Sequence, residues 1–107
     1  MKHLLITNKD DTKTVEVQKG DVLVVQLPEN PTTGYRWSLD QHDPSHLAMQ
    51  NATFSSAGAG IGAGGARSFT FVAGGAGETD LALSLRRPWE RGSAARQSFR
   101  AKVRSRE

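Results

Sequence analysis

The feature that most constrains the fold of this chain is a regular alternation of apolar and polar residues. The segments SFTFVA at 68–73 and LALSL at 81–85 are two clear examples. Successive side chains of a β-strand point to opposite faces, so this period is typical of strands with one buried face. No window longer than ten residues keeps an apolar stripe at helical spacing. The predicted strands are 14–17, 22–27, 35–39, 47–54, 68–73, 79–85 and 98–103, with 2–7 as an additional edge strand.

Seven or eight short strands in 107 residues, separated by clusters of Gly, Pro, Asn and Asp, favour an immunoglobulin-like β-sandwich. A chain of this length buries roughly 65% of the surface that its unfolded form exposes, enough for one core. It has no cysteine, which excludes disulfides, thiolate metal sites and a cysteine nucleophile. We therefore expect an all-β chain that forms a single domain over residues 1–107.

Three connections between the predicted strands have an unusual composition: ENPTTG at 29–34, SSAGAGIGAGGA at 55–66 and RRPWERGSAAR at 86–96. If each strand crosses the sandwich once, successive connections alternate between its two ends. The three loops then lie at the same end. The sequence thus predicts a cluster of loops on a rigid scaffold, an arrangement that immunoglobulin domains use for binding.

No motif for catalysis or for cofactor binding is complete. The glycine-rich segment contains GxGxxG, but a strand follows it where a dinucleotide site requires a helix. His42 and His46 have the spacing of a helical metal pair, but Pro44 lies between them and no glutamate or cysteine is placed to complete the shell. The carboxylates fall in turns and at strand ends, and no serine lies in GxSxG. We expect no catalytic residue, no metal and no cofactor.

The basic residues are concentrated at the C-terminal end of the sequence. Residues 1–85 hold six basic and nine acidic groups, whereas residues 86–107 hold eight basic and two acidic groups. The segment is interpreted as a solvated edge strand, because charged edges prevent sheets from pairing with one another. A nucleic-acid site is the alternative, but aromatic residues are not interleaved with its Lys and Arg as in single-strand platforms. We expect no nucleic-acid partner.

The apolar run at 4–6 is too short for a membrane span or a signal peptide. We expect no membrane span. As written, the sequence indicates a cytoplasmic protein, and it would be periplasmic or secreted if a leader had been removed.

The loop at 29–34 has a composition that restricts its backbone. Pro31 fixes its own φ near −65°, and Gly34 permits a positive φ where the chain enters the next strand. Thr32 and Thr33 are therefore expected to form a rigid tip. They either cap an ordinary turn or form part of a binding surface.

A binding surface is favoured by the segment Arg87, Pro88 and Trp89, which places a large aromatic in a polar loop. Tryptophan and arginine are the residue types most enriched at binding hot spots. A tryptophan folded back over the end of the sandwich is the structural alternative.

With its three loops in this order, the sequence resembles the chagasin-type inhibitors of papain-family cysteine peptidases. That family carries an NPTTG[YF] loop, a GxGG loop and an RPW loop, and the similarity extends over nearly the whole chain. It implies an immunoglobulin-like sandwich whose three loops enter the active-site cleft of the peptidase. The implied peptidase-binding residues are Asn30, Pro31, Thr32, Thr33, Gly34, Tyr35, Gly62, Ala63, Gly64, Gly65, Arg87, Pro88 and Trp89.

By this resemblance the protein is not an enzyme but a reversible, tight-binding inhibitor that acts as a monomer on cathepsin L-like peptidases. The alternative from another functional class is an adhesion or assembly module that uses the same loops on a different partner, since one fold supports many functions. Inhibition of a papain-family peptidase separates the two.

Overall fold

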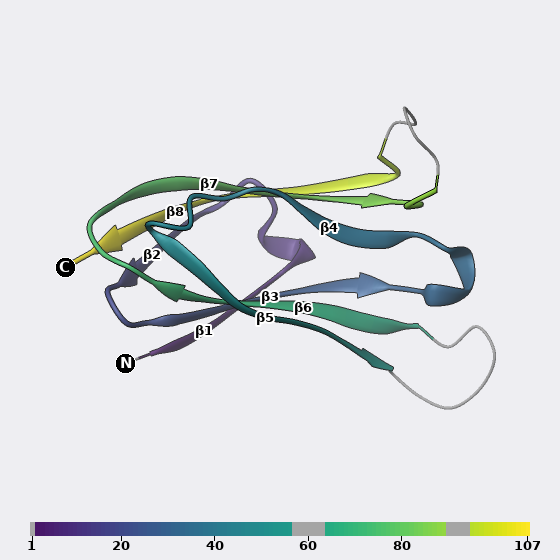
Figure 1. Ribbon diagram of the computed structural model, residues 1–107, viewed down its shortest axis with the longest axis horizontal. Coiled ribbons are helices and arrows are strands. Elements are labelled where there is room, and N and C mark those ends of the chain that lie inside the picture. Colours follow the sequence, from purple (N-terminus) through teal and green to yellow (C-terminus); the bar gives the residue numbers. More distant parts are fainter. Residues whose placement is uncertain (1, 57–63, 90–94) are drawn as a thin grey trace.

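The computed structural model describes residues 2–56, 64–89 and 95–107. These residues form an all-β sandwich of two four-stranded sheets (Figure 1), which confirms the predicted fold class. Its elements are β1 (His3–Thr7), β2 (Thr14–Gln18), β3 (Val22–Glu29), β4 (Arg36–Gln41), β5 (Leu47–Ser56), β6 (Gly65–Ala73), β7 (Gly77–Arg86) and β8 (Gln97–Arg106), with the 3-10 turns η1 (Asn8–Asp10) and η2 (Pro31–Thr33).

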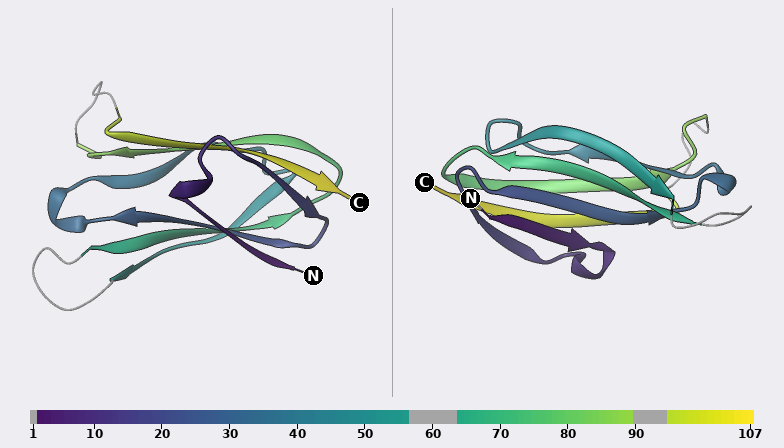
Figure 2. Two further views of the ribbon diagram at one scale, coloured as in Figure 1. Left: turned by 180° about the vertical axis from the view of Figure 1, so that it is seen from behind. Right: turned by 90° about the horizontal axis from the view of Figure 1, so that it is seen from below.

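One sheet has the strand order β1-β3-β6-β5 and the other has the order β2-β8-β7-β4. The predicted additional edge strand is present as β1, which runs parallel to β3. Strand β2 likewise runs parallel to β8, so each sheet has one parallel pair at an edge. Figure 2 shows these two edge strands from behind, together with the short connection that carries the chain from one sheet to the other.

The core lies between the sheets and follows the alternation of the sequence. In β3, Leu23, Val25 and Leu27 are fully buried, and the residues between them are half-buried. Fully burying such a side chain stabilises the fold by roughly 1.5–3 kcal/mol. The residues that the other strands contribute to this core are Ile6, Val17, Trp37, Leu47, Phe69, Phe71, Ala73, Leu81, Leu83, Leu85, Phe99, Ala101 and Val103.

The expectation that the basic C-terminal segment forms an edge strand is wrong. Strand β8 lies inside its sheet, between β2 and β7. Its residues Phe99, Ala101 and Val103 are buried, and the residues between them are exposed. The alternation of apolar and basic residues specifies one buried face and one solvated face, but it carries no information about how many neighbours the strand has.

The outward side chains of β8 form ion pairs with carboxylates of both neighbouring strands. On the β7 side, Lys102 and Arg104 lie 3.7 Å and 3.3 Å from Glu78. On the β2 side, Arg106 lies 3.5 Å from Glu16. Such exposed pairs each contribute little to stability, about 0–1 kcal/mol. They do give this face charges of both signs.

His42 and His46 lie in the connection between β4 and β5 and are half-buried. The ring of His42 packs against Phe71, with 5.8 Å between ring centroids, and His46 lies 3.8 Å from Asp43. The hydroxyl and the backbone amide of Ser45 donate to Asp43 and hold the pKa of that carboxyl below its usual value. The described residues include no group of three or more His, Cys, Asp or Glu placed to hold a metal ion.

Among the helical segments of the described ranges, none has the length and apolar character that a membrane crossing requires.

Candidate functional site

The described parts of the three unusual loops meet at one end of the sandwich (Figure 1), as the alternation of connections predicts. In one sheet, Gly65 is the partner of both Glu29 and Ser56, which brings the first two loops together. In the other sheet, Arg36 is the partner of Arg86, which brings the first and third loops together. We call the described residues 29–36, 64–67, 86–89 and 95–97 the loop end. Gly62 and Ala63, two of the predicted site residues, lie outside the described residues.

The first loop is a compact turn organised by Asn30. The side-chain oxygen of Asn30 accepts hydrogen bonds from the backbone N of Thr32 (3.1 Å) and from its hydroxyl (2.7 Å). The carbonyl oxygen of Asn30 accepts from the hydroxyl of Thr33 at 2.7 Å and from its backbone N at 3.2 Å. The same hydroxyl accepts from the backbone N of Tyr35 at 3.3 Å. Both threonines therefore cap the turn and, being exposed, also form its tip.

Gly34 and Trp89 join the first loop to the third. Gly34 has a φ of +80°, as the sequence predicts, and a Cβ at this position would overlap the end of the Trp89 ring. The indole thus lies directly against the glycine backbone. Even so, Trp89 remains 67% exposed. The tryptophan is held in place on one side and presented to solvent on the other.

The ring of Tyr35 contacts two arginines of the third loop. The guanidinium of Arg87 is 4.5 Å from the centre of the Tyr35 ring, and that of Arg96 is 5.1 Å from it. The Nε of Arg87 also donates to the carbonyl oxygen of Thr33 at 3.2 Å. A cation over an aromatic face contributes about 0.5–1 kcal/mol when exposed. These contacts fix the third loop against the turn. The sequence reasoning missed Arg96, whose one signal is its position just before β8.

A buried ion pair underlies the loops. Arg67 on β6 makes a bidentate interaction with Glu29 on β3, with N–O distances of 2.9 Å and 3.0 Å. Glu29 Oε1 also accepts from the backbone N of Trp37 at 2.7 Å, and Trp37 belongs to the other sheet. The carboxylate therefore links the two sheets directly beneath the turn. Sequence reasoning missed this pair, although Glu29 occupies an inward position in the alternation of β3.

Gly65 approaches its own chain closely. A Cβ on Gly65 would collide with the carbonyl oxygen of Ser55 and with the ring of Phe54. This glycine is therefore required for the pairing of β5 with β6. Gly64 lies beside it and lines a small hollow together with Asn30 and Tyr35.

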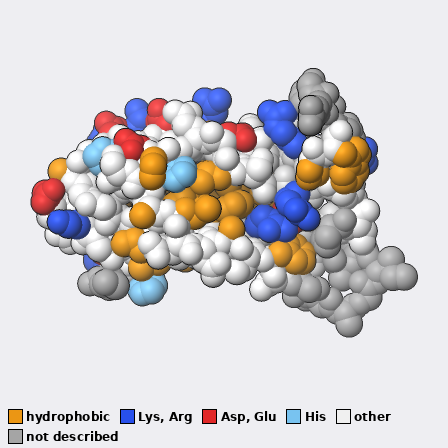
Figure 3. Space-filling view, viewed as in Figure 1, with side chains coloured by type: hydrophobic (Ala, Val, Ile, Leu, Met, Phe, Trp, Pro, Cys, Tyr) orange, Lys and Arg blue, Asp and Glu red, His pale blue; other side chains and the backbone are white. Residues whose placement is uncertain are grey.

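A groove with a cavity volume of about 670 Å³ runs across the loop end. Figure 3 shows basic side chains beside apolar ones in this region of the molecule. The groove is lined by Glu29, Thr32, Thr33, Gly34, Tyr35, Arg36, Phe54, Arg67, Arg87, Pro88 and Trp89.

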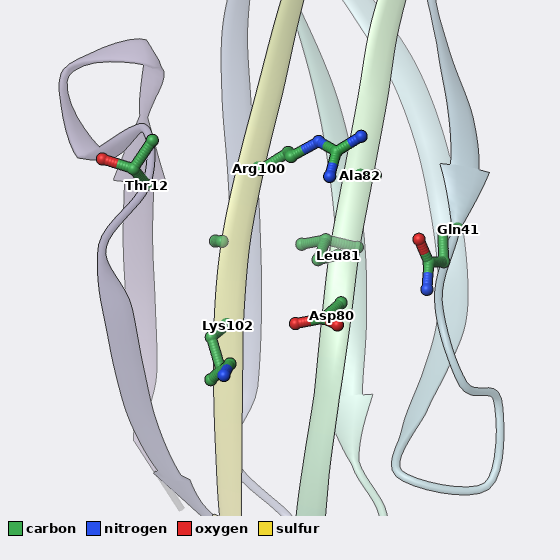
Figure 4. A pocket seen from close by; sticks show the side chains of 8 residues that line it. Thr12, Gln41, Asp80, Leu81, Ala82, Arg100 and Lys102 are labelled. Carbon is green, nitrogen blue, oxygen red and sulfur yellow. The ribbon is translucent and has the colours of Figure 1, made fainter.

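A second hollow, of about 280 Å³, lies over the sheet that contains β7 and β8 (Figure 4). Its lining includes Arg100 and Lys102 on β8 and Asp80 and Ala82 on β7. None of the predicted site residues lines it. The candidate site is therefore the loop end.

The contact between Gly34 and Trp89 can be tested against a second glycine. Gly20 has a φ of +91° and no atom within 4 Å of the position that a Cβ would take, so Gly20→Ala imposes backbone strain alone. We expect both Gly34→Ala and Gly20→Ala to lower the free energy of unfolding by about 1 kcal/mol. Only Gly34→Ala should also displace the indole, because the ring can swing away. The indole N–H resonance of Trp89 in NMR spectra should shift in that variant alone, and equal shifts in both variants would contradict the contact.

Comparison with known proteins identifies the family. Residues 16–103 match the family described as chagasin family peptidase inhibitor I42. Chagasin of Trypanosoma cruzi is 30% identical over 89 residues, covering 78% of this chain and 81% of its own length. Amoebiasin-2 of Entamoeba histolytica is 28% identical over 97 residues, covering 89% and 79%.

A solved structure agrees with this assignment. The crystal structure of the cysteine protease inhibitor EhICP2 from Entamoeba histolytica is similar to this fold, with a TM-score of 0.90 and 26% identity. The match covers 99% of this chain and 97% of the EhICP2 chain. With a matched segment that includes all three loops, this chain belongs to the chagasin family of cysteine peptidase inhibitors, whose members block peptidases and are not themselves enzymes.

Proposed function

We propose that the protein is a reversible, tight-binding inhibitor of papain-family cysteine peptidases of the cathepsin L type, which acts as a monomer and inserts its loop end into the active-site cleft. The observation that carries this proposal is the packing of the Trp89 ring against the backbone of Gly34. It joins the family's RPW and NPTTGY motifs into one surface, with an exposed aromatic beside an exposed turn.

The internal contacts of the loop end favour tight binding. Association normally costs about 0.5–1.5 kcal/mol for each flexible side chain that becomes ordered. The turn from Asn30 to Tyr35 is already held by its own hydrogen bonds, and Arg87 ties it to the third loop. Little order remains to be gained in the complex. Such preorganisation supports nanomolar affinity without a covalent bond.

Each loop has its own role in the proposed complex. The tip formed by Thr32 and Thr33 approaches the catalytic cysteine of the peptidase. Trp89 and Arg87 contact the opposite side of the cleft. The segment Gly62 to Gly65 lies along the cleft, where glycine permits close approach of two backbones.

Titration of the protein against papain and a cathepsin L-type peptidase, with a fluorogenic peptide substrate, tests this function. We expect nanomolar, reversible inhibition. Trp89→Ala should weaken it by about 30-fold, or about 2 kcal/mol, because a large exposed anchor is lost. Leu5→Ala is the matched control, since Leu5 on β1 is 59% exposed but lies away from the loop end.

The outcomes separate the functional classes. No inhibition at micromolar concentration by a folded sample would refute the inhibitor proposal and favour an adhesion or assembly module. Inhibition that is equal in Trp89→Ala and the wild type would assign the tryptophan to another role.

A further inference from the structure

The excess positive charge of the chain is located at its loop end. The loop end, residues 29–36, 64–67, 86–89 and 95–97, contains five arginines and one glutamate, a formal charge of +4, whereas the rest of the sequence holds nine basic and ten acidic groups. The fold brings the described parts of these segments to one end of a molecule that is 45 Å long. Charge is therefore distributed unevenly along the length of the protein, and the positive end is the proposed binding surface.

One of these arginines, Arg36, is available to a partner. Arg36 on β4 is exposed and has no ion pair within the described ranges. It lies opposite Arg86 on β7, and like charges on facing residues are unfavourable in a sheet. Glu29, by contrast, is buried and neutralised by Arg67. The Arg36 side chain is therefore free to pair with a carboxylate of a partner.

The groove at the loop end provides a concave surface on which some of these arginines lie. Arg36 and Arg87 line it together with Trp89, and Arg67, which also lines it, is already paired with Glu29. Such a groove fits acidic side chains beside an apolar contact, and arginine is well suited to bind carboxylates through two parallel hydrogen bonds.

We propose that the target peptidase carries acidic side chains on the rim of its active-site cleft, and that the arginines of the loop end steer the two proteins together. This inference rests on the proposed inhibitory function. Complementary charge at an interface mainly raises the association rate, by factors of about 10 to 1,000, and fixes the orientation of the encounter. The charge of the rim thus becomes a determinant of which peptidases are inhibited rapidly.

The test is the association rate with a cathepsin L-type peptidase, measured by stopped flow at salt concentrations from about 0.02 to about 0.5 M, a range over which the screening length falls from about 20 Å to about 4 Å. We expect the association rate to fall by roughly tenfold over this range. Arg36→Gln should lower the rate by roughly threefold at low salt and leave dissociation nearly unchanged.

The matched control is Arg100→Gln. Arg100 is an exposed arginine on the outer face of β8 in the same sheet, away from the loop end, and this variant should associate at the wild-type rate. Neutralising the acidic residues of the peptidase rim, by Asp→Asn and Glu→Gln substitutions, should abolish the difference between Arg36→Gln and the wild type.

Each result has one meaning. Inhibition with an association rate that is independent of salt, or lowered equally by Arg36→Gln and Arg100→Gln, overturns the steering inference and leaves the inhibitory function intact. No inhibition at any salt concentration overturns both. Salt-sensitive capture of single-stranded nucleic acid that is lost in Arg36→Gln, without a salt effect on the peptidase, would instead assign the arginines to a polyanion.

Discussion

Arg67→Ala is expected to lower the free energy of unfolding by about 3 kcal/mol or more, because it leaves the buried carboxylate of Glu29 without its cation. The Glu29 side chain is 2% exposed and that of Arg67 is 18% exposed, so solvent screens the pair weakly. The variant also loses the contact of the guanidinium with the Phe54 ring, at 5.5 Å. Chemical denaturation followed by circular dichroism measures the loss.

Two further variants separate the charge from the packing. Arg104→Ala removes an exposed ion pair with Glu78 and should cost less than about 1 kcal/mol. Adding Glu29→Gln to Arg67→Ala should recover part of the loss, because an uncharged amide is less costly to bury than a carboxylate without a cation. Equal costs for Arg67→Ala and Arg104→Ala would show that the buried pair contributes no more than a surface pair.

Thr32→Asp should weaken inhibition by at least about 100-fold, or about 3 kcal/mol, while the protein remains folded. In the proposed complex the new carboxylate loses its water on entering the cleft, and burying a charge is costly. In the free protein the change is mild, since Thr32 is exposed and loses one hydrogen bond to Asn30. We expect the free energy of unfolding to fall by less than about 1 kcal/mol.

Thr32→Ser is the matched control for this position. It keeps the hydroxyl that donates to the Asn30 side chain and removes a methyl group. Its inhibition should remain within a few-fold of the wild type. If Thr32→Asp unfolds the protein, the threonine is structural; if it stays folded and inhibits fully, the tip does not enter the cleft.

Much of this fold can be predicted from the sequence, because the alternation of apolar and polar residues is a local pattern. The alternation in β3 places Leu23, Val25 and Leu27 on one face, and a single period of two residues is enough to predict it. The same reasoning, extended by counting crossings, predicts that the three loops share one end. The positive φ of Gly34 follows from the composition of the turn.

Other features depend on which segments become neighbours, and local patterns do not encode this. The alternation in strand β8 indicates one solvated face but not the number of neighbouring strands, and β8 lies between β2 and β7. Strand β1 pairs in parallel with β3, and β2 pairs in parallel with β8. Alternation predicts each of these strands but not the partner with which it pairs.

The sequence alone therefore determined the class of fold, the buried face of each strand and the set of loops at one end, since these follow from side-chain periodicity and backbone restrictions. Only the tertiary structure decided that Glu29 and Arg67 join the sheets beneath the loops, that two arginines contact the ring of Tyr35 and that Trp89 lies on Gly34. Each of these contacts joins side chains from different segments. Their geometry is set by the packing of the whole sandwich.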